Sequence, residues 1–308
     1  MNDYWWQTTF PQGRQTLRIA SANGAPSQIA YGEVGHGQPL ILVHGVGVWS
    51  YCWRYNIEPL SQHYRVICFD AKGYGFSEKP NHGEQSGHQI LELERIIRGL
   101  CDQPAIVVAE SLGALTALAV AENCPDLIDR LVVINVPIFP KRLPSWGMRA
   151  LANFPIALIQ AVDRLRLARL FAPLVRQLTR RGRCEVVIDP TQITAEEVYW
   201  AAYPYIECPN AITKFAEDLK LSLDELERLA QGQPNLITQI QAGLGAIATP
   251  TLILWSDQDA WFPVADGEAL QRYLPNSKLQ ILPNCGHQAA AGCPDIVNQA
   301  ILAFVLPA

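Results

Sequence analysis

Ala109-Glu110-Ser111-Leu112-Gly113 lies between an apolar run, residues 105–108, and a run of good helix formers, residues 114–121. This order predicts a strand, a tight turn that carries a serine, and then a helix, as in the G-x-S-x-G pattern. Small residues flank such a serine because the turn is strained and the two backbones crowd together. Ala109 stands where the pattern has its first glycine. An alternative interpretation is that Ser111 only caps an ordinary helix.

Short β-rich segments and helical patterns alternate on both sides of this turn. The predicted strands cover residues 17–20, 28–32, 39–44, 65–70, 105–109 and 130–135, followed later by 250–255 and 278–282. The strands from 39–44 to 130–135 are apolar runs without alternation, which is typical of strands buried on both faces. We therefore predict an α/β fold with a mostly parallel β-sheet flanked by helices.

Residues 137–245 interrupt this alternation and contain no convincing strand. We interpret them as a helical cap, or lid, inserted into the α/β core. The core would then consist of two parts, residues 1–136 and residues 246–308.

The composition is typical of a globular enzyme, with 49% hydrophobic residues, 17% charged residues and a formal net charge of -5. This charge argues against a nucleic-acid partner. The eight cysteines form no C-x-x-C pair, so we expect buried thiols and neither a zinc site nor a disulfide framework. The first residues do not resemble a secretory signal, and no apolar run reaches the roughly 18 residues that cross a bilayer. We expect a cytoplasmic protein that needs no cofactor.

Polar residues follow the predicted strands at the sheet edge where open parallel sheets bind ligands. Ser111 follows the strand 105–109, and His287 follows the last strand in Asn284-Cys285-Gly286-His287. A serine hydroxyl must give its proton to a base as it attacks, and histidine has the best-matched pKa. The chain order of serine, acid and histidine is the order that accompanies this serine turn.

The acid that orients the histidine is predicted in the loop after the strand 250–255. This loop offers Asp257 and Asp259. We prefer Asp259, because it lies deeper in the loop while Asp257 borders the strand. Either aspartate could instead cap the helix that begins near Val264.

Two backbone N–H groups are predicted to stabilise the oxyanion of an acyl-transfer reaction. Leu112 follows the nucleophile at a helix start, where the helix dipole assists. Val46 lies in the turn His44-Gly45-Val46-Gly47, whose glycines let the backbone approach a ligand closely.

Several motifs occur in a fixed order along the chain: the H-G-x-G turn at 44–47, Trp53, the turn Asp70-Ala71-Lys72-Gly73-Tyr74-Gly75-Phe76-Ser77, the serine turn, the acid loop ending at Pro263, and Gly286-His287. With these motifs the chain resembles the α/β-hydrolase fold family from Leu40 to the C-terminus. The resemblance implies a catalytic triad of Ser111, Asp259 and His287, with Val46 and Leu112 as the oxyanion hole. Ala109 and Ser256 depart from glycines that are common in the family.

The resemblance also leads us to assign Glu110 and Trp53 to substrate binding. The position before the nucleophile often borders the pocket in this family, and a carboxylate there would disfavour anionic substrates. Glu110 could instead interact only with the dipole of the following helix.

The predicted cap is strongly basic between Lys141 and Arg183, with ten basic residues and one acid, Asp163. The segment therefore carries +9, and the rest of the chain carries -14. Apolar residues recur among the arginines at spacings near three and four, which predicts amphipathic helices. One interpretation is peripheral contact with an anionic membrane. The other is that the apolar face closes over the active site while the arginines are only solvated.

These patterns predict a cofactor-free serine hydrolase that cleaves a lipophilic carboxylic ester through an acyl-enzyme. A lipid, long-chain or prenyl ester, including a chlorophyll-type ester, fits an apolar cleft under the cap. The alternatives are a carbon–carbon bond hydrolase with the same triad and a non-catalytic ligand-binding protein of this fold. The resemblance argues against epoxide hydrolase or dehalogenase activity, because those relatives carry an aspartate where this chain has Ser111.

Overall fold

The computed structural model describes residues 2–80 and 83–306, and its centre is a single eight-stranded sheet. The strand order is β1-β2-β4-β3-β5-β6-β7-β8. The bounds are β1 (Gln15–Ala20), β2 (Pro26–Val34), β3 (Pro39–Val43), β4 (Arg65–Phe69), β5 (Ala105–Glu110), β6 (Ile128–Ile134), β7 (Thr251–Ser256) and β8 (Ser277–Leu282). β2 pairs antiparallel with β1 and β4, and the remaining neighbours are parallel. The predicted α/β fold with a mostly parallel sheet is confirmed.

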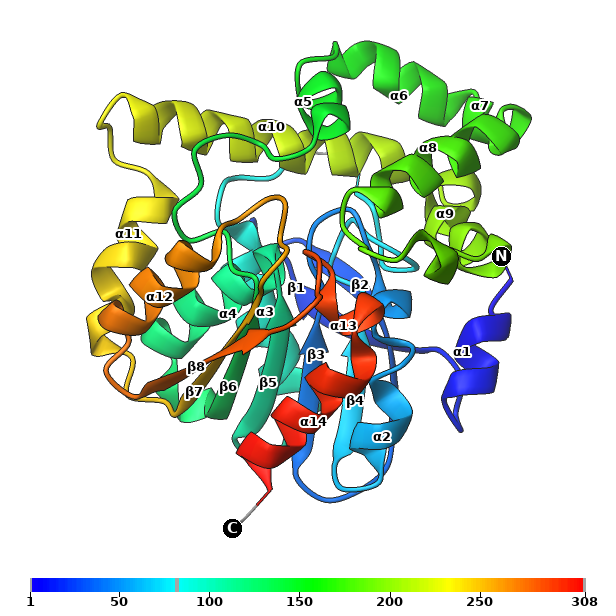
Figure 1. The fold of residues 1–308 in the computed structure, drawn as a ribbon. Coiled ribbons are helices and arrows are strands. Elements are labelled where there is room, and N and C mark those ends of the chain that lie inside the picture. The colour runs from blue at the N-terminus through cyan, green and yellow to red at the C-terminus, as the bar shows by residue number, and fades with distance from the viewer. Residues whose placement is uncertain (1, 81–82, 307–308) are drawn as a thin grey trace.

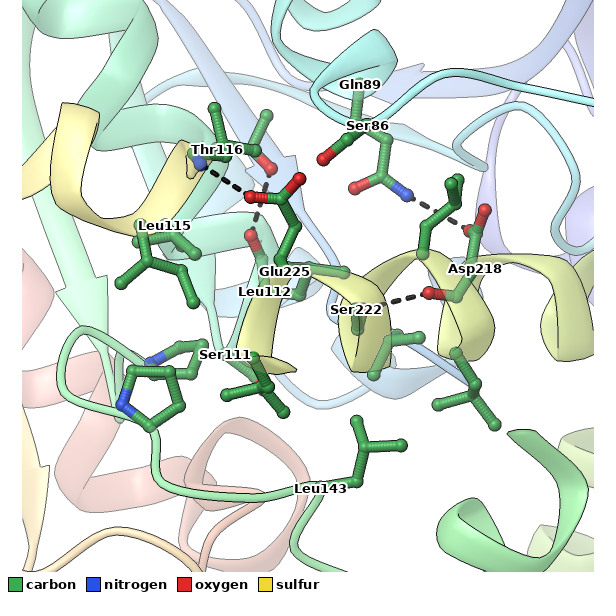
Figure 2. Close-up of a pocket in the computed structure, with 18 of the residues that line it drawn as sticks. Ser86, Gln89, Ser111, Leu112, Leu115, Thr116, Leu143, Asp218, Ser222 and Glu225 are labelled. Atoms are coloured by element: carbon green, nitrogen blue, oxygen red, sulfur yellow. Dashed lines mark hydrogen bonds between the residues drawn. The ribbon is translucent and has the colours of Figure 1, made fainter. Parts of the chain in front are cut away.

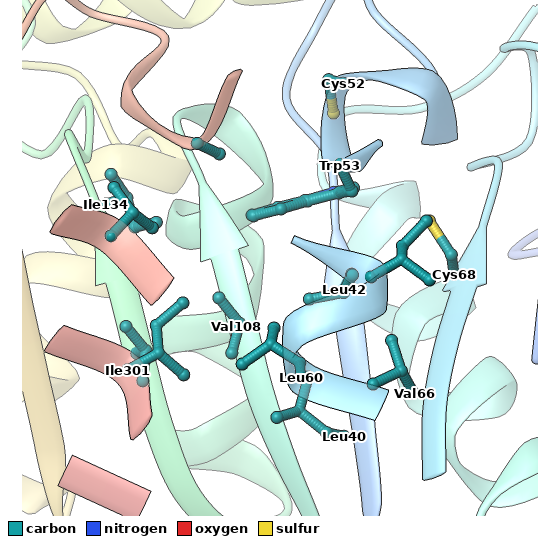
Figure 3. Packing of buried hydrophobic residues seen from close by; sticks show 14 of the residues in the cluster. Leu40, Leu42, Cys52, Trp53, Leu60, Val66, Cys68, Val108, Ile134 and Ile301 are labelled. Atoms are coloured by element: carbon teal, nitrogen blue, oxygen red, sulfur yellow. The ribbon is translucent and has the colours of Figure 1, made fainter. Parts of the chain in front are cut away.

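The central strands read as apolar runs because both faces of the sheet are covered. On β5, Ile106 and Val108 enter one hydrophobic cluster, while Ala105, Val107 and Ala109 enter a second cluster on the opposite face. This split follows the two-residue period of a strand. Figure 3 shows the first cluster, in which Leu60 of α2 (Ile57–Ser61) and Ile301 of α14 (Pro294–Val305) pack near Val108.

The second cluster is covered by three helices that follow strands in the chain. They are α3 (His88–Leu100), α4 (Leu112–Asn123) and α12 (Val264–Tyr273). Smaller elements complete the core: α1 (Tyr4–Thr9), the 3-10 turn η1 (Ser50–Trp53) and α13 (Ala289–Gly292).

The chain between β6 and β7 forms helices and short 3-10 turns. The helices are α5 (Trp146–Ala152), α6 (Ile156–Arg164), α7 (Leu167–Leu170), α8 (Ala172–Cys184), α9 (Ala195–Glu207), α10 (Ala211–Ala230) and α11 (Leu236–Gly243). Figure 1 shows α5 to α10 gathered over the upper edge of the sheet, at the end where β5 leads into α4. Within the described residues, no helix combines the length and apolar character needed to cross a bilayer.

Candidate active site

Ser111 lies on the turn between β5 and α4 in a backbone conformation that few non-glycine residues adopt, with φ 55° and ψ -127°. The turn is crowded by the end of β3. A Cβ on Gly113 would lie 2.5 Å from the His44 carbonyl oxygen, and a Cβ on Gly45 would lie 3.0 Å from the Ser111 Cβ. Small residues are therefore needed here for steric reasons, and the serine is held at the carboxyl edge of the sheet.

The structure brings the three predicted triad residues together from the ends of three segments that are distant in sequence. Ser111 Oγ lies 2.9 Å from His287 Nε2, and His287 Nδ1 lies 2.8 Å from Asp259 Oδ2. Both the imidazole and the aspartate are buried. This geometry allows His287 to accept the serine proton while the carboxylate orients the ring and stabilises its protonated form.

Asp259, rather than Asp257, is the acid that faces the histidine. Its other oxygen, Oδ1, accepts hydrogen bonds from the backbone N–H groups of Trp261 and Phe262, at 2.8 and 3.1 Å. Asp257 instead accepts from the Cys285 N–H at 3.2 Å. Neither aspartate caps α12, whose N-cap is Pro263 without a side-chain hydrogen bond.

Asn135, which cannot serve as the acid and for which the sequence indicated no other role, supports the histidine loop. It directly follows β6 with a positive φ of 49°. Its Nδ2 donates to the His287 carbonyl at 2.7 Å and to Ser256 Oγ at 3.0 Å. The sequence offered one signal for this role, an asparagine directly after a strand at the edge that carries the site. Asparagine adopts a left-handed backbone conformation more readily than most residues.

Val46 and Leu112 lie in the wall of the cavity that also contains Ser111. Leu112 is the first residue of α4, so its N–H belongs to the free amides of a helix start. The structure therefore places both residues in the wall of the cavity that contains the nucleophile. Their role as an oxyanion hole stays a prediction.

The assignment of Trp53 and Glu110 to substrate binding needs correction. Trp53 is fully buried in the core, where Figure 3 shows it above Leu42. Glu110 is also buried, and its Oε1 accepts the Ala290 N–H at 3.0 Å. Among the residues that the structure describes, neither lines the cavity beside Ser111. Both side chains belong to the face of the sheet that packs against α13 and α14.

The cavity beside Ser111 is mostly apolar and has a volume of about 1060 Å³, counted with the solvent space at its mouth. Its apolar wall comes from α4, the 137–148 segment, α10, α11 and the acid loop: Leu115, Pro137, Leu143, Met148, Leu219, Leu226, Leu236, Ile237, Ile240, Trp261 and Phe262. The Trp261 ring also lies 4.4 Å from the His287 ring, centroid to centroid. The cavity thus joins the triad to the helical segment.

Two buried carboxylates form a polar strip along one wall of this cavity (Figure 2). Both belong to α10: Asp218 accepts from Gln89 Nε2 at 3.1 Å, and Glu225 accepts from the Leu236 N–H at 2.5 Å. The sequence did not predict this position for either residue. The local pattern of a long amphipathic helix does not indicate which of its sides faces Ser111, about 100 residues earlier in the chain.

Behind this strip lies a buried group of charged side chains. His88 is 3.0 Å from Glu92 and 3.5 Å from Asp218. Burial by itself lowers the His88 pKa, but hydrogen bonds to Asp218 and Glu92 outweigh it and raise the pKa to about 9. Glu84, His88 and Glu92 have the donor atoms of a metal site, but Lys72 Nζ lies 2.8 Å from Glu84 and also contacts Glu92. The chain therefore supplies its own cation to these acids.

Comparisons with known proteins agree with this architecture. Residues 38–290 match the family model described as alpha/beta hydrolase fold. The chain is 28% identical to epoxide hydrolase 4 of Mus musculus, over 94% of this chain and 78% of that protein. It is 29% identical to 2-hydroxy-6-oxo-6-phenylhexa-2,4-dienoate hydrolase of Comamonas testosteroni, over 90% and 91% of the two chains.

A solved structure shows the same fold at lower identity. The meta-cleavage product hydrolase from Pseudomonas fluorescens IP01 superposes with a TM-score of 0.71 at 22% identity, covering 94% of this chain and 96% of the other. With the serine turn, the sheet order and the match over residues 38–290, this chain belongs to the alpha/beta hydrolase fold family.

Proposed function

We propose that this protein is a serine hydrolase that cleaves an uncharged, lipophilic carboxylic ester through an acyl-enzyme. The observation that carries the proposal is the hydrogen-bonded series from Ser111 Oγ through His287 to Asp259, with distances of 2.9 and 2.8 Å. Hydrolase names among the relatives support the general reaction class.

In this mechanism Ser111 Oγ attacks the ester carbonyl carbon while its proton passes to His287 Nε2. The N–H groups of Val46 and Leu112 stabilise the oxyanion that forms. The carbon–oxygen bond then breaks, and His287 protonates the leaving alcohol. A water molecule attacks the acyl-enzyme with His287 as base, which releases the acid and restores Ser111. Asp259 keeps its charge and orients the imidazole throughout.

The wall of the cavity supports an uncharged substrate. Leucine, isoleucine and methionine side chains favour an alkyl, prenyl or similar lipophilic group. Asp218 and Glu225 are seven residues apart on α10, so their carboxylates follow each other along one side of the helix. His88 compensates the charge of Asp218, so a substrate carboxylate would be repelled mainly by Glu225.

The second candidate is hydrolysis of a carbon–carbon bond by the same three residues. It is favoured by the Comamonas testosteroni relative, whose name describes a dienoate substrate and whose length is 91% covered. Arg142 also lies in the cavity wall and could face a carboxylate. Epoxide hydrolysis fits less well, since Ser111 occupies the position of the aspartate nucleophile expected for that activity.

The test compares p-nitrophenyl esters of increasing acyl length with 2-hydroxy-6-oxo-6-phenylhexa-2,4-dienoate. We expect ester turnover that rises from the shortest acyl chains to longer ones, and little turnover of the dienoate. Ser111→Ala should lower ester turnover by at least about 10⁴-fold, because the nucleophile is lost. Ser222→Ala, a second serine in the same cavity, should change it by less than about tenfold, the cost of one hydrogen bond.

Two results would contradict the proposal. Ester turnover that survives Ser111→Ala would exclude Ser111 as nucleophile. Faster turnover of the dienoate than of every ester would favour the carbon–carbon hydrolase instead. Folding of each variant is checked by its circular dichroism spectrum.

A further inference from the structure

The outer side of α6, α7 and α8 exposes large apolar side chains to solvent. Phe154, Leu158 and Leu165 lie in α6 or next to its ends. Leu170, Phe171, Leu174 and Leu178 lie in α7, in α8 or between them. Each is more than half exposed, and Leu170 reaches 71%. Spacings such as 171, 174 and 178 place them along one side of a helix. We call this set, together with Trp146 of α5, the outer helical face.

This face is not the lining of the active-site cavity. The cavity is lined by residues of the 137–148 segment, α10 and α11, and among the described residues none from 154 to 184 takes part. The inner sides of α6 and α8 contact α10 and α9, respectively. The apolar residues of the outer helical face therefore point away from the cavity, whereas Leu143 and Met148, at the start of the basic segment, line it.

Charge distinguishes this face from the rest of the molecule. The segment 141–183 carries +9 within a chain whose formal net charge is -5; of its basic residues, Arg183 is buried against Glu197, Arg169 pairs with Glu207 and Arg142 lies in the cavity wall. Its one acid, Asp163, is buried and accepts hydrogen bonds from the Thr213 N–H and hydroxyl. Arg164 and Arg181 are exposed beside the apolar residues of α6 and α8. Figure 1 shows these helices together at one end of the molecule.

We propose that the outer helical face docks on the surface of an anionic lipid bilayer. Leucine and phenylalanine side chains enter the boundary between head groups and acyl chains, while the arginines contact lipid phosphates. A second copy of this chain fits less well, because a symmetric dimer would bring two basic faces together. An anionic bilayer attracts the basic segment 141–183 and repels the remainder of the chain, which carries -14, so docking through this segment is favoured.

Docking in this orientation brings the bilayer close to the active-site cavity. Trp146 is 75% exposed, and Met148, two residues later, lines the cavity. The helix α5 therefore joins the docking face to the wall that receives the substrate. The docking itself does not depend on the proposed function, because it is measured without turnover.

The experiment is flotation of the full chain with vesicles of phosphatidylcholine, alone or with about one-third phosphatidylglycerol. We expect flotation with the anionic vesicles at low salt and a marked decrease at about 0.3 M salt, where charges are screened. Arg164→Gln/Arg181→Gln should weaken partitioning more than about tenfold, because each basic residue near such a surface contributes about a factor of five. Leu174→Ser/Leu178→Ser should weaken it by a similar factor through lost apolar burial.

Matched controls are available outside the helical segment. Arg272→Gln/Lys278→Gln removes two exposed basic residues of the core, and Tyr273→Ser removes an aromatic residue that is 54% exposed on α12. Both should partition like the unmodified protein. Hydrolysis of a short, water-soluble ester by every variant reports separately on the proposed function, so the two proposals can fail independently.

Three results would overturn the docking proposal. The first is no flotation with anionic vesicles at low salt. The second is that the control variants weaken vesicle binding as much as the variants of the outer helical face, which would show that the protein binds without a preferred orientation. The third is a concentration-dependent dimer in light scattering that Leu174→Ser/Leu178→Ser abolishes without vesicle binding, which would make the face an interface between copies.

Discussion

Glu110 is adjacent to Ser111 in the chain, but its side chain lies on the face of β5 that packs against α13 and α14, away from the face that α4 covers. Side chains alternate across a strand, so Glu110 shares the face of Ile106 and Val108, and there it accepts the Ala290 N–H. Ala290 lies three residues after His287. Glu110 therefore connects the end of β5 to the segment that carries the histidine, without touching the cavity.

The environment of Glu110 predicts a pH-dependent stability. Burial raises its pKa to about 7, although the Ala290 N–H, His287 and Arg183 partly oppose the shift. The folded state thus holds the proton more tightly than the unfolded state. Stability from this group is complete below the unfolded pKa, near 4.5, and is lost as the pH rises through about 7.

Glu110→Gln keeps an acceptor for the Ala290 N–H but cannot ionise. Relative to this variant, the unmodified protein should lose roughly 3 kcal/mol of unfolding free energy between pH 4.5 and 8. Urea unfolding of both proteins across this range measures the difference. If the unfolding free energies of the two proteins change in parallel with pH, Glu110 has the same pKa in the folded and unfolded states, and the prediction is wrong.

At the scale of elements, the contact between the ends of β3 and β5 and the start of α4 sets the position of the serine. A Cβ on Gly113 would meet the backbone carbonyl oxygens of His44 and Val43 at 2.5 and 2.8 Å. These atoms belong to the end of a central strand, so they cannot move aside as the tip of a flexible side chain can. Ala109 shows that the first small position tolerates a methyl group, while Gly113 does not have that space.

Gly113→Ala should therefore destabilise the protein by at least about 1–3 kcal/mol, the usual cost of overpacking. Gly182→Ala is the matched control in α8, since no atom lies within 4 Å of its added Cβ. That change should be neutral or stabilise by up to about 1 kcal/mol through helix propensity. Denaturant midpoints of the two variants compare the sites. Equal midpoints would contradict the steric account of the turn.

The sequence pattern was sufficient for most elements, because the central strands are buried on both faces and therefore read as apolar runs. The same reading could not locate Asp218 and Glu225 in the cavity wall. α10 is amphipathic along its length, and the side that faces Ser111 depends on how the helix crosses the sheet edge. The role of Asn135 was missed for a similar reason, since its hydrogen-bond partners are Ser256, the last residue of β7, and His287 in the loop after β8.

At the scale of the whole molecule, one buried ionic group ties the helical segment to the core. Glu197 of α9 accepts from Arg183 of α8 at 2.8 Å, and its Oε1 also lies 3.4 Å from a guanidinium nitrogen of Arg54, next to η1. All three side chains are nearly inaccessible to solvent. The single carboxylate therefore compensates two buried guanidinium groups.

Glu197→Gln should cost about 3–5 kcal/mol, because it leaves two buried cations without their anion. The control is Glu207→Gln on the same helix, whose partner Arg169 is half exposed. An exposed pair of that kind contributes less than about 1 kcal/mol. Thermal unfolding measures both variants. A similar small shift for the two would show that Glu197 does not hold the helical segment to the core.

The sequence by itself determined the fold family and the order of the chemical groups. A strained turn needs small residues, a doubly covered strand needs an apolar run, and both requirements are local enough to read along the chain. Only the tertiary structure decided which side each ambiguous residue faces. Glu110 and Trp53 lie in the core, Asp218 and Glu225 line the cavity, and the residues of the outer helical face are exposed. The physical reason is that a side chain's surroundings depend on packing partners distant in sequence, which no local period encodes.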